Sequence, residues 1–212
     1  ISRANNYLQY YYHAWSSEII YFLNQQRSLL ALQKAEKMKK QAFADRYPYG
    51  IFSCIRTMGH IYKSRGNFDL SAQYYQEALD YMLKNMPDQD PSQLYSSLAE
   101  YYRNTQKDYA TALDYCEKAL KSAKTERNIA QAMIEKCLVL FRQGRIDEFN
   151  DCYKEAVQMA DRCKLSASVS LLIAHISKNI LDKQYEQAHA HADQLSEKGL
   201  QQHAYIYECA KD

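Results

Sequence analysis

Residues that interrupt helices are scarce in this sequence, which has five glycines and three prolines among 212 residues. Glycine and proline are the strongest breakers of regular structure, so their scarcity predicts long helices with short connections. Long apolar runs are also missing. The longest, from Val169 to Ile176, falls far short of the roughly 20 residues that a membrane-spanning helix needs. We therefore expect no membrane contact by this segment.

The sequence also has no strong excess of one charge. Its 27 lysines and arginines nearly balance 25 aspartates and glutamates, which gives a formal net charge of +2 at pH 7. A protein dedicated to binding nucleic acid would instead carry a clear basic excess. The balance therefore predicts that nucleic acid is not a partner.

The six cysteines include no C-x-x-C pair and no dense, short-spaced set. They therefore do not indicate a disulfide framework, and we interpret them as small hydrophobic residues in the core. Two of the cysteines, Cys137 and Cys163, are considered as candidate catalytic nucleophiles. Cys137 is expected to be buried and inert, and Cys163 to be the more exposed thiol. An ordinary core or surface role is the simpler interpretation of both.

No motif for catalysis or for a cofactor is present. The sequence lacks G-x-S-x-G, the glycine string of a P-loop and H-E-x-x-H. His189 and His191 are two residues apart, so on a helix they point about 200° from each other and cannot share one metal ion. We therefore expect no cofactor, no metal site and no enzymatic activity in this segment.

What the sequence does contain is a helical hairpin pattern in "IRTMGHIYKSRGNFDLSAQYYQEAL". Intervals of three and four residues place side chains on one face of a helix. Two such sets flank Gly66, which is expected to end the first helix, while Gly59 is expected to let the paired helix approach closely. The first set is Ile55, Met58, Gly59 and Tyr62, and the second is Phe68, Ser71, Tyr75 and Ala78.

The same pair of sets recurs three more times. The second copy, whose turn is one residue longer, has Tyr95, Leu98, Ala99 and Tyr102, then Tyr109, Ala112, Cys116 and Ala119. The third copy has Met133, Cys137 and Leu140 before Gly144, then Ile146, Phe149, Tyr153 and Ala156. A weaker fourth copy keeps Leu172, Ile176, Tyr185 and Ala188.

This recurrence over residues 50–198 resembles the tetratricopeptide repeat, a helix–turn–helix unit that stacks into a solenoid. The resemblance implies an all-α fold, a right-handed solenoid of antiparallel helix pairs with about 11 helices. We expect a single solenoid domain with six segments. They are a divergent helical pair at 1–47, TPR-like repeats at 48–86, 87–125 and 126–164, a degenerate repeat at 165–198, and the start of a further or capping helix at 199–212.

The resemblance also implies a concave groove lined by the first helix of each pair. Groove residues are expected one position after the packing residues, roughly 100° around the helix. In the three better copies they are Arg56, His60 and Lys63, then Ser96, Glu100 and Arg103, then Ile134, Leu138 and Phe141. The fourth copy adds Ile173, Ser177 and Ile180, and the N-terminal pair adds His13, Ser17 and Ile20.

Such a groove would be polar and basic near its centre and apolar toward its C-terminal end. It predicts a protein or peptide ligand with an acidic or carboxylate group beside an apolar segment. The alternative is that Arg56 and Lys63 are solvated charges, and that the apolar residues of the third copy are covered by later helices. The carboxylate-binding version of the family uses lysine, asparagine and arginine at set groove positions, whereas here asparagine is missing from the first set and the second set contains Glu100.

The resemblance and the missing catalytic motifs together predict a non-catalytic scaffold that binds proteins or peptides. The aromatic-rich "YLQYYYHAW" and the later "GNFDLSAQYYQEAL" also resemble the repeat regions of bacterial sensor histidine kinases and related regulators. This resemblance implies the sensory or regulatory region of a larger signalling protein, in which the kinase lies elsewhere. The alternative is a stand-alone adaptor or assembly protein without a signalling role.

The location and assembly state follow from the same resemblance. It favours a periplasmic or other extracytoplasmic region of a membrane protein, with the cytoplasm as the alternative, and six cysteines fit an oxidising compartment poorly. Because the sequence begins with Ile1 rather than Met, we interpret it as a segment of a longer chain. Uncapped solenoid ends are sticky, so exposed tyrosines there could mediate a homodimer.

Overall fold

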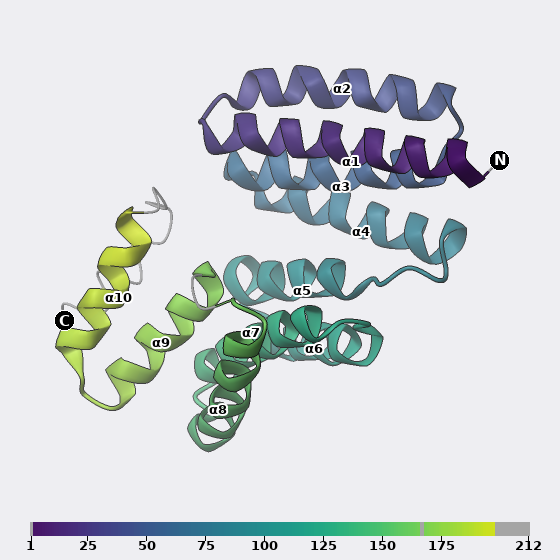
Figure 1. The fold of residues 1–212 in the computed structure, drawn as a ribbon. Helices are drawn as coiled ribbons and strands as arrows, with labels where there is room; N and C mark the ends of the chain where they lie inside the picture. The colour runs from purple at the N-terminus through teal and green to yellow at the C-terminus, as the bar shows by residue number, and fades with distance from the viewer. Residues whose placement is uncertain (1, 166–167, 198–212) are drawn as a thin grey trace. The chain divides into compact units, whose positions relative to one another are not determined.

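The computed structural model describes residues 2–165 and 168–197, and these residues form ten α-helices and one π-helical turn without any strand (Figure 1). The predicted all-α fold is confirmed, and the helix number is close to the expectation. The segment 199–212, where a further helix is predicted, lies outside the described residues, as does Cys209. The chain divides into two compact units, one ending at Tyr101 and the other beginning at Tyr102.

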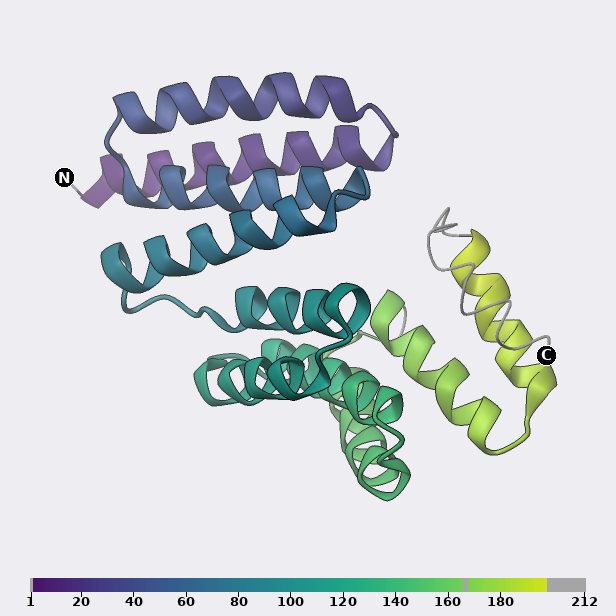
Figure 2. The same cartoon turned by 180° about the vertical axis from the view of Figure 1, so that it is seen from behind.

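The first unit consists of five helices that pack in order along the chain. They are α1 (Ser2–Asn24), α2 (Ser28–Ala44), α3 (Pro48–Ser64), α4 (Phe68–Asn85) and α5 (Ser92–Tyr101). Helix α1 packs against both α2 and α3, and α4 packs against α3 and α5. Figures 1 and 2 show the first four helices lying side by side from both directions.

The α3–α4 hairpin shows why the sequence folds in this way. A Cβ atom at Gly59 would lie 2.6 Å from the Tyr75 ring, so only glycine permits the observed approach of the two helices. Gly66 has φ +74° in the turn after α3, a conformation that L side chains rarely adopt. The Asn67 side chain then caps α4 by accepting a hydrogen bond from the Leu70 amide at 3.2 Å. Both predicted roles of glycine are confirmed.

The second unit begins with the π-helical turn η1 (Tyr102–Gln106). It continues with α6 (Tyr109–Ser122), α7 (Glu126–Arg142), α8 (Ile146–Arg162), α9 (Val169–Leu181) and α10 (Tyr185–Glu197). Each turn of a π-helix holds one residue more than a hydrogen-bonded α-turn. The turn therefore accommodates the extra residue by which the second copy exceeds the first.

The core of the second unit lies around α7, which packs against α6, α8 and α9. One cluster of buried residues joins α7 and α8 to the start of α9, and includes Ile134, Phe149 and Leu171. Another joins Leu138 to α9 and α10. As predicted for the cysteines as a class, Cys116 and Cys137 are buried here, and Cys54 is buried in the first unit; Cys152 and Cys163 are half-buried.

Candidate ligand groove

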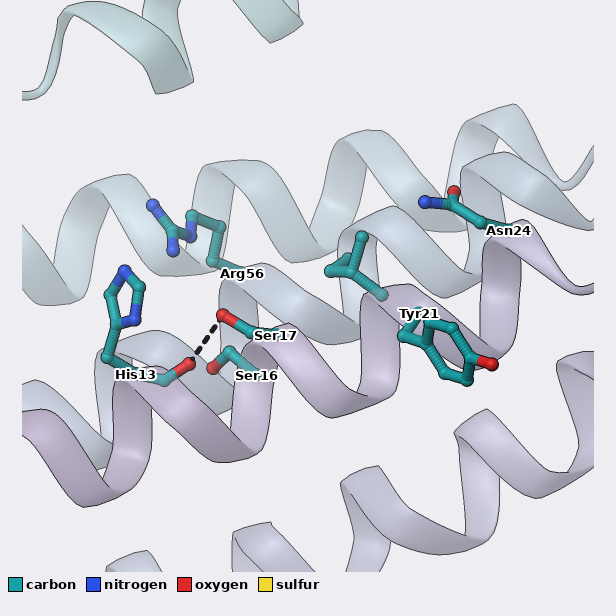
Figure 3. A pocket seen from close by; sticks show the side chains of 7 residues that line it. His13, Ser16, Ser17, Tyr21, Asn24 and Arg56 are labelled. Atoms are coloured by element: carbon teal, nitrogen blue, oxygen red, sulfur yellow. Dashed lines mark hydrogen bonds between the residues drawn. The ribbon is translucent and has the colours of Figure 1, made fainter. Parts of the chain in front are cut away.

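A cavity of about 310 Å³ lies between α1 and α3 of the first unit (Figure 3). We call it the α1–α3 groove. Helix α1 contributes six of its lining residues, and α3 contributes one. The lining residues are His13, Ser16, Ser17, Ile20, Tyr21, Asn24 and Arg56. The structure thus brings together four predicted groove residues, Arg56 and the three from the N-terminal pair.

Helical spacing explains why α1 presents this lining. His13, Ser17 and Asn24 recur at intervals of four and seven residues and therefore share one face. The neighbouring face carries Tyr12 and Ile19, both fully buried. Because these two side chains hold α1 against the rest of the unit, the face with His13 and Ser17 stays at the surface.

A small polar network joins the two helices beneath the groove. The Ser16 and Ser53 hydroxyl oxygens lie 2.7 Å apart, and Ser16 also donates to the Tyr12 carbonyl at 3.0 Å. Thr57 donates to the Ser53 carbonyl at 2.7 Å. Small buried hydroxyl residues let α1 and α3 approach while satisfying their own hydrogen bonds. Sequence reasoning missed Ser16 because it lies on the packing face, where an apolar residue is the usual expectation.

Arg56 is the cationic residue of the α1–α3 groove. Its side chain is half-buried, with Cζ 5.3 Å from the centroid of the Phe52 ring. Its Nε is buried and has no hydrogen-bond partner among the described residues. Burial lowers the pKa of Arg56, but a guanidinium remains charged at neutral pH. Leaving a buried donor unpaired costs about 1–3 kcal/mol, so a ligand that offers an acceptor would remove this cost.

His60 follows Arg56 on α3 but does not act as a cation. Its Nδ1 lies 2.9 Å from the Tyr75 hydroxyl, and the two rings pack edge to face. Burial lowers the pKa of His60 to about 3, and the nearby charges of Arg56 and Lys63 act in the same direction. The imidazole is therefore neutral at neutral pH. It joins α3 to α4 and leaves Arg56 as the cation on this part of the helix face.

Lys63 is compensated within the first unit. Its Nζ lies 2.5 Å from a Glu100 carboxylate oxygen, which connects α3 to α5. Ser96 is half-buried on the same helix as Glu100. The basic part of the predicted groove is therefore smaller than expected, because His60 is neutral and Lys63 forms an ion pair.

The predicted groove residues that belong to the second unit lie in its core or pack against it. Arg103 is buried and forms an ion pair with Glu135, with N–O distances of 2.6 and 3.3 Å. Ile134 and Leu138 are 1% and 2% exposed. Ser177 is also buried, and its hydroxyl donates to the Ile173 carbonyl. Phe141, Ile180 and Ile173 pack in or against the same apolar clusters.

The prediction that Ile134 and Leu138 face a ligand is contradicted by this burial. Helix α9 packs on α7 and covers this face, and its Leu171 and Leu172 belong to the same buried clusters as Ile134 and Leu138. The alternative weighed from the sequence, in which later helices cover the apolar residues, therefore describes this region correctly.

Other chemistry is limited in the part of the chain that the structure describes. Residues 2–165 and 168–197 contain no group of three histidine, cysteine or acidic side chains that could hold a metal ion. His191 stacks on His175 with ring centroids 5.0 Å apart, and its Nδ1 lies 3.1 Å from the Asn179 amide nitrogen. No helix in these ranges is both long enough and apolar enough to cross a membrane.

Comparison with known proteins agrees with the helical hairpin architecture. A sequence family described as tetratricopeptide repeat matches residues 57–81, which extend from α3 through the Gly66 turn into α4. No curated protein sequence matches the chain. Among solved structures, the protein BtubC (BKLC) from P. vanneervenii is 17% identical with a TM-score of 0.58, covering 81% of this chain and 71% of that chain.

The nearly identical TPR-like repeats of a protein described as a kinesin light chain from Podosopora anserina are also similar. They are 12% identical with a TM-score of 0.58, covering 90% of this chain and 95% of that chain. A variant of these repeats with one substitution is 11% identical with a TM-score of 0.59, covering 92% and 96%. At such low identity these structures support the fold and carry no information about the ligand.

Proposed function

We propose that this chain, with its tetratricopeptide-like hairpins, is a non-catalytic scaffold that binds a protein or peptide in the α1–α3 groove. The observation that carries this proposal is the buried Arg56 Nε, which has no hydrogen-bond partner among the described residues, in a side chain that lines a surface cavity. A native protein normally pairs its buried polar atoms, and an exception requires an explanation. Because this atom is buried, the ligand supplies the missing partner when the Arg56 side chain turns toward the groove.

The lining of the α1–α3 groove suggests the chemistry of that ligand. A guanidinium offers planar, directional donors that match a carboxylate. Ile20 and the Tyr21 ring provide apolar surface on the same face of α1. The volume is at the lower end of the range for ligand pockets, about 300–1,000 Å³, so it suits one or two anchoring side chains. The expected ligand is a peptide with an acidic group beside an apolar residue.

A peptide-binding experiment tests the groove. Fluorescent peptides that vary independently in acidic and apolar residues are titrated against the wild-type chain, and affinities are read from anisotropy. Arg56→Ala is expected to weaken binding of the acidic peptides by at least about tenfold, because a hydrogen bond to a charged group contributes about 1.5–3 kcal/mol. Peptides whose acidic residue is replaced by its amide should lose the dependence on Arg56.

The matched control is Arg65→Ala, which removes an exposed arginine just beyond the end of α3. It should leave the affinities unchanged. Circular dichroism confirms that both variants remain folded. If Arg56→Ala binds every peptide as tightly as the wild type, the α1–α3 groove is not the binding site.

We further propose that this scaffold is the sensory or regulatory region of a larger bacterial signalling protein, of the sensor histidine kinase type. The resemblance of the aromatic leading helix and of the repeat segments to such regions supports this context, as it does an extracytoplasmic location. A stand-alone adaptor is the alternative. The full-length gene distinguishes them: a hydrophobic span and a kinase core after Asp212 support the sensory context, and a stop codon shortly after Asp212 contradicts it.

A further inference from the structure

Two cysteines meet inside the α7–α8 hairpin of the second unit. Cys137 and Cys152 lie at nearly equal distances in sequence from the turn at Gly144, so antiparallel pairing of the helices brings them face to face. The Cys137 thiol donates to the Cys152 sulfur, and the two Sγ atoms are 2.8 Å apart. A disulfide bond measures about 2.05 Å between sulfurs. Bond formation therefore needs a shift of less than about an ångström between the two atoms.

The two thiols differ in exposure and in electrostatic surroundings. Cys137 is buried, whereas Cys152 is half-buried and reaches the surface. The hydrogen bond from Cys137 holds the pKa of the Cys152 thiol below its usual value, and Lys136 acts in the same direction against burial, Glu155 and Glu117. The same hydrogen bond and burial raise the pKa of Cys137. Cys152 is thus the thiol that ionises first and meets solvent.

The buried cysteines elsewhere lack this combination. Burial raises the pKa of Cys54 to about 12, and it also raises the pKa of Cys116. Donation to a backbone carbonyl does not separate them, because Cys54 donates to that of Ala35 and Cys152 to that of Met133. A reactive cysteine needs thiolate character and access, and a disulfide also needs a second sulfur in contact. Among the described cysteines, Cys152 with Cys137 meets these conditions together.

We propose that Cys137 and Cys152 form an oxidation site that a small-molecule disulfide, of the glutathione disulfide class, converts into an intramolecular disulfide. The Cys152 thiolate attacks one sulfur of the reagent, forms a mixed disulfide and releases one thiolate. The Cys137 thiol then gives its proton to solvent as its sulfur attacks the Cys152 sulfur, and the second thiolate leaves. The two cysteines lose two electrons and two protons, and the reagent is reduced to two thiols.

The resulting bond would tie together the halves of α7 and α8 that are nearer the Gly144 turn. A cross-link of this kind stabilises mainly by restricting the unfolded chain. Oxidation should therefore raise the melting temperature. This site goes beyond the proposed ligand groove and is independent of it, because every residue that lines the α1–α3 groove belongs to the first unit.

The test uses the wild-type chain under native conditions. The reduced protein is incubated with oxidised glutathione, free thiols are blocked with N-ethylmaleimide, and the protein is digested for peptide mapping by mass spectrometry. The expected product is a linked pair of peptides containing Cys137 and Cys152, with the mass of two hydrogen atoms lost. Dithiothreitol should reverse the link, and the oxidised protein should melt at a higher temperature than the reduced one.

Substitutions assign the two roles. Cys137→Ser should stop at a mixed disulfide of Cys152 with glutathione, and Cys152→Ser should leave Cys137 unmodified. Cys163→Ser, which changes another half-buried thiol of the same unit, should still form the link. The proposal is overturned if native wild-type protein stays reduced, or if Cys152 accumulates as the mixed disulfide without linking to Cys137. Because both readouts come from the wild-type chain, they hold even if a serine variant fails to fold.

Discussion

The α3–α4 hairpin of the first unit and the α7–α8 hairpin of the second are built on one sequence pattern, but they present different faces. The small position of the first helix is Gly59 in one and Cys137 in the other. A tyrosine follows at the same place on the second helix, Tyr75 or Tyr153. Each tyrosine hydroxyl contacts a histidine Nδ1, at 2.9 Å in the first hairpin and 2.6 Å in the second.

The two histidines come from different helices. His60 lies on the partner helix α3, whereas His175 lies on the following helix, α9. At the position that corresponds to His60, α7 carries the buried Leu138, which α9 covers. One hairpin thus keeps polar side chains on this face, and the other uses the same face to pack against the next helix. A repeat position therefore has no fixed role until its neighbour is known.

The largest expected difference in stability between variants of the two units comes from their ion pairs. Arg103 and Glu135 have side chains only 5% and 6% exposed. Removal of one partner leaves a buried charge, so Glu135→Ala should lower the free energy of unfolding by about 3–5 kcal/mol. Urea unfolding followed by circular dichroism measures this loss.

The matched pair in the first unit provides the control. Lys63 and Glu100 have side chains 41% and 26% exposed, and pairs near water contribute about 0–1 kcal/mol. Lys63→Ala should therefore cost far less than Glu135→Ala. Equal losses in the two variants would show that burial does not separate the two ion pairs.

The close approach of helices in the first hairpin leads to the next prediction. Gly59→Leu places a side chain where the Tyr75 ring already lies, so it should destabilise the chain by about 3 kcal/mol. Gly66→Ala adds a methyl group in open space and strains only the backbone, at a cost of about 1 kcal/mol. Thermal melting of both variants gives the order, and an unchanged melting temperature for Gly59→Leu would contradict the helix register.

A pH dependence of stability that involves His60 is the next prediction. Its pKa falls from about 6.5 in an unfolded chain to about 3 in the folded one. Between these values the unfolded state binds a proton that the folded state does not, so stability falls as the pH decreases. His60→Gln keeps an acceptor for Tyr75 and cannot titrate there. Urea unfolding at pH about 7 and about 4 should show a smaller loss in the variant.

His175 of the second unit provides a comparison for His60. Burial and the neighbouring His191 also lower the pKa of His175, so His175→Gln should reduce the acid sensitivity in the same direction. If His60→Gln loses as much stability as the wild type over this pH range, His60 is not held neutral by its surroundings.

Much of the fold could be predicted from local spacing. The intervals of Met58, Gly59 and Tyr62 define the packing face of α3, and Gly66 marks its end, because helix geometry and backbone conformation act over a few residues. The same reasoning found four lining residues of the α1–α3 groove. It could not predict that Ile134 is buried, because the helix that covers it begins 35 residues later, at Val169.

The sequence by itself determined the helical hairpins, their turns and the absence of familiar catalytic motifs, since these depend on the order and type of nearby residues. Only the tertiary structure decided which cations are neutralised. Lys63 reaches Glu100 and Arg103 reaches Glu135 across 37 and 32 residues, and Arg56 Nε is left buried without such a partner among the described residues. Charges find one another through helix packing, and the spacing within one helix does not contain that information.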